Sequence, residues 1–127
     1  MTQDLFHLIA IPEFTDQRGR LRVCEFEDVL PFVAPRAFLI SDVPPSASRA
    51  NHSVSCELFL VAITGACTLK AASGHLEQCY RIGSEKKGVL IPAGTWISLF
   101  EFQPGTQILA LASKKYRDTR YGHTPMA

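Results

Sequence analysis

Several features that would mark a metal, redox or membrane protein are missing from this chain of 127 residues. The cysteines form no Cys-x-x-Cys pair and have no zinc-finger spacing to a histidine. No apolar run is long enough to cross a bilayer, and the first residues carry no basic segment of the kind that opens a signal peptide. We therefore expect a cytoplasmic protein without membrane contact. Its reduced core or near-core thiols are Cys24, Cys56, Cys67 and Cys79.

A charge excess of one sign is also missing. The chain has 13 basic and 12 acidic side chains, so its net charge is +1 and nothing favours nucleic acid as a partner. A basic run lies near the end of the chain, and short runs of this kind are usually solvated. We expect residues 114–127 to form a tail beyond a core of about residues 5–113.

The chain does contain many short apolar segments separated by turn residues, including eight Gly and eight Pro. Even spacing of short strands with such turns predicts a single all-β domain, a sandwich or a barrel. No segment before the tail has convincing helical periodicity. Strands are predicted over residues 5–11, 21–25, 36–43, 57–63, 66–72, 76–82, 89–91, 96–102 and 108–112.

Two motifs resemble the signatures of the cupins, which have a double-stranded β-helix (jelly-roll) barrel. The first covers residues 51–57, followed by Gly65, and the second covers residues 88–97 with its Gly-Pro-Gly skeleton intact. Cupins usually place metal-binding histidines at positions where this chain has Val54 and Ile97. Because a metal needs three or four converging ligands, we predict no bound metal and no cofactor.

Six segments, spread over roughly residues 8 to 121, have an informative order and spacing. These are residues 16–21 with Glu25, Pro31-Phe32 with Arg36, residues 49–54, residues 64–67, residues 92–96, and Leu111-Ala112-Ser113 with Tyr116, Asp118 and Tyr121. Through these segments the chain resembles one branch of the cupins, the dTDP-4-keto-6-deoxyglucose 3,4-ketoisomerases of deoxysugar biosynthesis, which serve lipopolysaccharide or surface polysaccharide.

The resemblance implies a metal-free enzyme, usually a homodimer, that binds a dTDP-linked keto sugar in the barrel. Its reaction moves a carbonyl from C4 to C3 through an enediol, and the family uses a histidine pair for the proton transfers. His52 matches one member of that pair. Histidine also suits this chemistry because its pKa lies near operating pH.

The remaining candidate residues each have a structural alternative. Glu25 is either a catalytic carboxylate that orients His52 or one partner in a salt bridge across the barrel. The guanidinium groups of Arg18, Arg36 and Arg49 suit pyrophosphate. Arg36 and Arg49 can instead form structural ion pairs, and Arg18 can instead hydrogen-bond within its own turn. Trp96 and Tyr116 either contact the ligand or pack in the protein, and Asn51 either donates to the sugar or caps its loop. The candidate substrate-binding residues are Arg18, Arg36, Arg49, Asn51, Trp96 and Tyr116.

Two other functions remain open from the sequence. A domain that has lost two histidines can bind a nucleotide sugar, or assist a partner enzyme, without turnover. A metal-dependent cupin dioxygenase is the weakest alternative, since the ligand set is incomplete.

Overall fold

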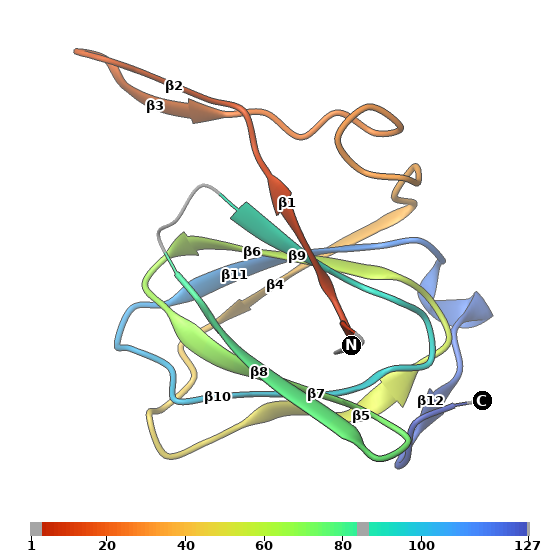
Figure 1. Cartoon of the computed structure of the whole chain (residues 1–127). Helices are drawn as coiled ribbons and strands as arrows, with labels where there is room; N and C mark the ends of the chain where they lie inside the picture. Colours follow the sequence, from red (N-terminus) through yellow and green to blue (C-terminus); the bar gives the residue numbers. More distant parts are fainter. Residues whose placement is uncertain (1–3, 84–86, 127) are drawn as a thin grey trace.

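The computed structural model describes residues 4–83 and 87–126, which form two five-stranded antiparallel sheets that face each other (Figure 1). The first sheet, in spatial order, contains β1 (His7–Ala10), β9 (Lys87–Ile91), β6 (Leu58–Thr64), β11 (Gln107–Ala112) and β4 (Arg36–Ser41). The second contains β12 (Tyr121–Gly122), β5 (Arg49–Val54), β10 (Trp96–Phe100), β7 (Cys67–Ser73) and β8 (Leu76–Ile82). From β4 to β11 the chain changes sheet at nearly every connection, so the prediction of an all-β jelly-roll barrel is confirmed.

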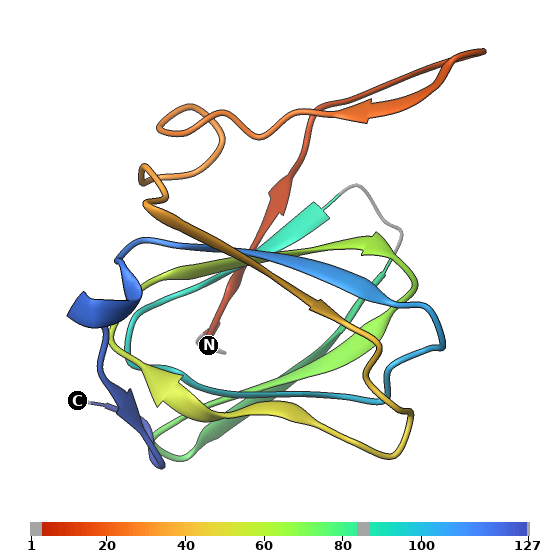
Figure 2. The same ribbon diagram turned by 180° about the vertical axis from the view of Figure 1, so that it is seen from behind.

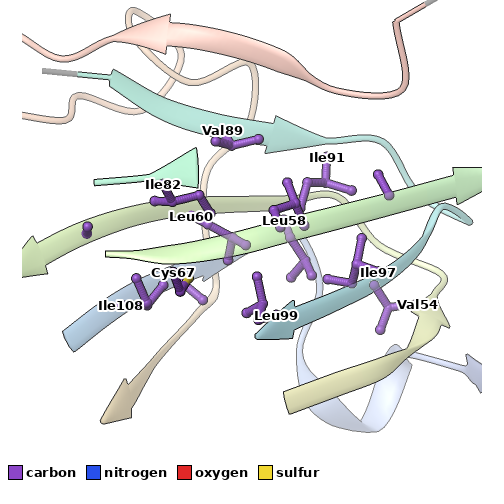
Figure 3. Close-up of a cluster of buried hydrophobic side chains, with 14 of the residues drawn as sticks. Val54, Leu58, Leu60, Cys67, Ile82, Val89, Ile91, Ile97, Leu99 and Ile108 are labelled. Atoms are coloured by element: carbon purple, nitrogen blue, oxygen red, sulfur yellow. The ribbon is translucent and has the colours of Figure 1, made fainter. Parts of the chain in front are cut away.

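The core lies between the sheets, where alternate side chains of each strand meet (Figure 3). On β11, Ile108 and Ala110 point inward and are fully buried, whereas Leu109 is on the outer face. β6 is buried on both faces, because its outer residue Phe59 packs in a second apolar cluster. Gly88 packs directly against the Phe59 ring, which leaves no room for a Cβ atom at that position.

The second apolar cluster lies on the outer face of the first sheet, under the segment that links β3 to β4. Leu30, Cys24 and Phe32 from that segment pack against it. Before this segment, β2 (Glu13–Asp16) and β3 (Gly19–Arg22) form a hairpin that stands away from the barrel (Figure 1). Arg22 anchors the base of the hairpin, since its Nη1 donates to the Ala62 carbonyl oxygen at 2.8 Å.

The last residues form more than a tail. A 3-10 turn, η1 (Tyr116–Asp118), and the short strand β12 follow β11, and Figure 2 shows them beside β5 at one end of the barrel. β12 pairs with β5, and Ser53 Oγ donates to the Thr124 carbonyl oxygen at 2.6 Å. The C-terminal segment therefore extends the second sheet rather than lying free in solvent.

Several predictions for the N-terminal half were wrong. The strand predicted over 21–25 ends at Arg22, and Leu21 is 61% exposed because it belongs to the protruding hairpin. β5 was not predicted, since its polar sequence has no apolar alternation. After Leu58 the predicted strands agree with β6 to β8, β10 and β11 within a few residues, and β9 begins earlier than predicted, at Lys87. Residues 84–86 of the predicted polar loop lie outside the described residues.

The cysteines are free among the described residues, and two of them are buried, Cys56 and Cys67. Cys24 is half-buried in the outer apolar cluster. The prediction was wrong for Cys79, which is exposed on β8. In the described part of the chain, no helix has the length and apolar character needed to cross a membrane.

Candidate active site

A pocket of about 330 Å³ opens between the two sheets and is lined by side chains of β4, β5, β6, β10, η1 and β12. We call it the barrel pocket. Its apolar walls come from the barrel core and include Val54, Leu58, Leu60, Ile97 and Leu99. Its polar groups are Arg36, Arg49, His52, Tyr116 and Tyr121. An apolar cavity of this size with a few polar groups is typical of a small-molecule site.

A bulge in β5 sets the position of His52. Opposite the bulge, Ile97 of β10 pairs with His52, but the next residue, Ser98, pairs with Ala50, so Asn51 is an extra residue. Ala50 and Asn51 have φ angles of +69° and +60°, a left-handed conformation that is strained for alanine. Two hydrogen bonds to serines fix the Asn51 side chain. Its Nδ2 donates to Ser48 Oγ at 3.0 Å, and its Oδ1 accepts from Ser98 Oγ at 2.7 Å.

The His52 imidazole is only partly exposed and faces the barrel pocket. Its Nδ1 atom is buried and has no hydrogen-bond partner among the described residues. The ring meets the Tyr121 ring edge to face, with 5.0 Å between centroids and an interplanar angle of 75°. Burial lowers the pKa of His52 below its ordinary value, so the neutral, proton-accepting form predominates at neutral pH.

Arg36 enters the barrel pocket from β4 and is held between two aromatic rings. Its guanidinium carbon lies 5.5 Å from the Phe38 ring centroid and 5.7 Å from that of Tyr116. Nη1 donates to Tyr121 Oη at 3.2 Å, and Nη2 to Cys56 Sγ at 3.8 Å. The buried Nε atom has no partner among the described residues, so one donor of this cation remains available.

Arg49 is the second cation of the barrel pocket, and its side chain is exposed on β5. The pocket lining includes no Asp or Glu among the described residues. A cavity with two arginines and no described acidic residue attracts a dianionic ligand, and guanidinium groups suit the oxygens of a diphosphate.

Four predicted site residues lie outside the barrel pocket. Arg18 is on the exposed hairpin, where its Nη2 pairs with Asp16 at 2.7 Å. Glu25 is an exposed residue of the segment after β3, and Asn51 is bonded to serines on the other side of β5. Trp96 lines a separate shallow hollow beside His75 and His123. The structure therefore brings together His52, Arg36, Arg49 and Tyr116, but not the other four.

Comparison of the chain with known protein families gives a match over nearly its whole length. The family described as "FdtA: WxcM-like, C-terminal" matches residues 4–125.

The chain belongs to this family.

Individual proteins that resemble the chain in sequence or structure are named as 3,4-oxoisomerases or 3,4-ketoisomerases. The chain is 26% identical over 115 residues to TDP-4-oxo-6-deoxy-α-D-glucose-3,4-oxoisomerase of Aneurinibacillus thermoaerophilus, covering 90% of this chain and 83% of that protein. A double mutant of the QdtA 3,4-ketoisomerase of Thermoanaerobacterium thermosaccharolyticum, in complex with TDP, superimposes with a TM-score of 0.90 at 25% identity. That comparison covers 97% of this chain and 90% of QdtA.

A third comparison concerns the fold alone. The WlaRB TDP-quinovose 3,4-ketoisomerase of Campylobacter jejuni has a TM-score of 0.88 at 24% identity and covers 94% of this chain and 92% of its own. Together the comparisons confirm the predicted resemblance to the sugar 3,4-ketoisomerases and favour an isomerase over a binding domain without turnover.

At two positions in its wall, the barrel pocket has aliphatic residues where a metal-binding cupin is expected to have histidines. Val54 and Ile97 are buried there, with 2% of each residue exposed, and Figure 3 shows them next to each other. In the described part of the chain, no group of three or more His, Cys, Asp or Glu side chains is arranged to hold a metal. The metal-free reaction stays a prediction.

One polar residue of the barrel pocket, Tyr121, was missed by sequence reasoning. It lies in the segment predicted to be a tail and was not among the candidate substrate-binding residues. It reaches the barrel pocket because β12 pairs with β5, a contact between residues more than 60 positions apart. The signal available in the sequence was its place in the segment after Leu111 that resembles the ketoisomerases.

Proposed function

We propose that this chain is a sugar-nucleotide 3,4-ketoisomerase that moves a carbonyl from C4 to C3 of a dTDP-linked 4-keto-6-deoxyhexose, through an enediol and without a metal. One observation carries the proposal: the partly buried His52 imidazole faces a cavity of about 330 Å³ in which two arginines are the only charged side chains among the described residues. The relative from Aneurinibacillus thermoaerophilus is named for a sugar of this type, and the superimposed QdtA structure is that of a 3,4-ketoisomerase in complex with TDP.

His52 is the proton carrier in this proposal. A hydrogen next to a ketone is acidic enough for removal by a neutral imidazole held in place. The lowered pKa of His52 keeps the ring neutral in the free protein. After it takes the C3 proton, the imidazolium is the acid that returns a proton to C4.

The remaining groups bind and orient the sugar nucleotide. Arg36 and Arg49 hold the diphosphate, with Arg36 fixed by the Phe38 and Tyr116 rings. The aliphatic wall that contains Val54 and Ile97 suits the carbon face and 6-methyl group of a deoxy sugar. The same wall excludes water, which strengthens the interactions of charged groups in the pocket.

We also propose that the enzyme is a cytoplasmic homodimer. Free cysteines fit a reducing compartment. The outer face of the first sheet has an apolar hollow of about 320 Å³ that includes Val61, Ile63 and Leu109. On the protruding hairpin, Phe14 and Leu21 are 63% and 61% exposed, and these apolar side chains are a second surface that another copy of the chain would cover.

The direct test is incubation of the protein with dTDP-4-keto-6-deoxyglucose, followed by NMR. We expect the C4 ketone signal to be replaced by that of a C3 ketone at a rate proportional to protein concentration. A protein that binds dTDP by calorimetry but leaves the keto sugar unchanged would be the non-catalytic binding domain instead.

A further inference from the structure

The 3,4-isomerisation moves two protons, one between carbon atoms and one between oxygen atoms. A single imidazole accounts for the carbon proton but leaves the oxygen proton without a carrier. We propose that Tyr121 is a further catalytic residue, whose phenol protonates O4 and takes the proton from O3. This inference rests on the proposed function and names the second proton carrier of the same site.

The first observation is the position of Tyr121 in the second sheet. In the ladder between β12 and β5, Tyr121 pairs directly with Val54. Side chains of directly paired residues project from the same face, with Cβ atoms about 5 Å apart. Both residues line the barrel pocket. The Tyr121 phenol is therefore beside the position where the resemblance expects a second histidine and this chain has valine.

The second observation is the contact with His52. The two rings meet edge to face, with centroids 5.0 Å apart, so one sugar can touch both groups. C3 and C4 of a hexose are bonded neighbours, so the carbon proton and the oxygen proton of this reaction are exchanged at adjacent atoms. Their two carriers must therefore lie side by side at the sugar, as the two contacting rings do.

The third observation is the hydrogen bond from Arg36. Its Nη1 donates to Tyr121 Oη at 3.2 Å, and a guanidinium group has no acceptor. The phenol oxygen is thus the acceptor in this contact, and its own hydrogen is directed to another partner. The neighbouring cation also stabilises the phenolate that forms when this hydrogen is given to O4.

The proton and electron balance closes with these two groups. His52 removes the C3 proton, the C3–H electron pair becomes the C3=C4 double bond, and the C4=O π pair moves to O4, which takes the Tyr121 proton. The phenolate then removes the O3 proton, the O3–H pair forms the C3 carbonyl, and the C3=C4 pair takes the proton from the His52 imidazolium at C4. No oxidant or reductant is needed.

This division of labour fixes the configuration of the product. His52 lies on one face of the sugar, and it both removes the C3 hydrogen and delivers the C4 hydrogen from that face. In a gluco-configured pyranose, the hydrogens at C3 and C4 lie on opposite faces. Delivery from the face that held the C3 hydrogen therefore places the new C4 hydroxyl axial.

The test compares Tyr121→Phe with wild type and with Tyr80→Phe, a matched loss of a hydroxyl. Tyr80 is on β8 and packs against Phe6, away from the barrel pocket. Tyr121 is 43% exposed, so loss of its hydroxyl does not threaten the fold. The quantities to be measured are kcat for dTDP-4-keto-6-deoxyglucose, dTDP affinity by calorimetry, the melting temperature, and the C4 configuration of the product by NMR.

We expect Tyr121→Phe to lower kcat about 100-fold, the usual effect of losing one positioned donor to a developing oxyanion. The dTDP affinity and melting temperature are expected to match wild type, Tyr80→Phe to retain wild-type kcat, and the product to have an axial C4 hydroxyl. A Tyr121→Phe enzyme within threefold of wild-type kcat would overturn the inference while leaving the isomerase intact. So would a fall in kcat matched by falls in dTDP affinity and melting temperature, or an equatorial product. Wild type that does not convert the sugar would instead overturn the proposed function, and the role of Tyr121 with it.

Discussion

At the scale of single residues, the chemistry of this protein depends on one imidazole in an apolar setting. His52 has aliphatic neighbours in the barrel pocket, Val54 and Ile97, and the described lining of that pocket supplies no carboxylate to stabilise a positive charge. Desolvation then dominates, and it disfavours the protonated form. This is the opposite of a histidine paired with an acid, whose pKa would rise.

The pKa of His52 leads to a prediction for the pH dependence of catalysis. Because this pKa is lowered from 6.5, the base stays neutral as pH falls to 6.5 and is protonated only below it. The acid limb of kcat/KM, which reports the free enzyme, should therefore have its midpoint below pH 6.5. A midpoint above pH 6.5 would show that a nearby negative charge, rather than burial, controls the pKa of the ring.

The residue scale also shows how much of the site a sequence can predict. Spacing within the ketoisomerase-like segments selected His52, Arg36, Arg49 and Tyr116, which β4, β5 and η1 bring into one pocket, while their roles stay predictions. Glu25 was predicted at the end of a strand over residues 21–25. The strand ends at Arg22 in the protruding hairpin, so Glu25 lies exposed outside the barrel pocket. Tyr121 was missed because its place depends on β12 pairing with β5, which no local pattern reveals.

At the scale of elements, the β5 bulge is the feature that orients the site. It leaves Ala50 in a left-handed conformation at φ +69°. Alanine there costs about 1–2 kcal/mol relative to a normal backbone, whereas glycine adopts it without steric penalty.

Replacement of Ala50 by glycine should therefore stabilise the fold. Glycine removes the steric cost but adds about 0.5–1 kcal/mol of unfolded-state entropy. We expect Ala50→Gly to raise the free energy of unfolding by about 0.5 kcal/mol in urea denaturation. Ala72→Gly on β7, where φ is not positive, is the control and should lower it by a similar amount. Equal losses at both positions would show that the bulge carries no strain.

The strands themselves divide into those that sequence predicts and those that it does not. The later strands have apolar runs bounded by turns, and tight turns at Gly65 and Gly74 have the positive φ expected there. β5 has the polar sequence of a strand that lines a ligand pocket, so its pattern lacks period-two alternation. β2 and β3 protrude from the barrel. Their apolar residues Phe14 and Leu21 are typical of a core by sequence, but both are exposed in the single chain.

At the scale of the whole molecule, the segment between β3 and β4 covers only part of the outer face of the first sheet, and β4 at the edge of that face stays exposed. Leu39 on β4 is 64% exposed on this face. A charge placed at the centre of a dimer interface is costly because it must lose its hydration.

For a homodimer formed through this face, Leu39→Glu should give a monomer. Light scattering should report twice the 14.0 kDa mass of one chain for wild type and a single mass for the variant. Leu76→Glu on β8, which changes an exposed leucine of the other sheet, should remain a dimer. A dimer that survives Leu39→Glu would place the interface elsewhere.

The most direct measurement of the central claim is kcat for conversion of dTDP-4-keto-6-deoxyglucose by EDTA-treated protein, compared between His52→Ala and His75→Ala. His75 is an exposed turn residue outside the barrel pocket. The account predicts full activity after EDTA for wild type and His75→Ala, and a loss of about 1000-fold for His52→Ala. Activity that disappears with EDTA, or that persists without the His52 imidazole, would contradict it.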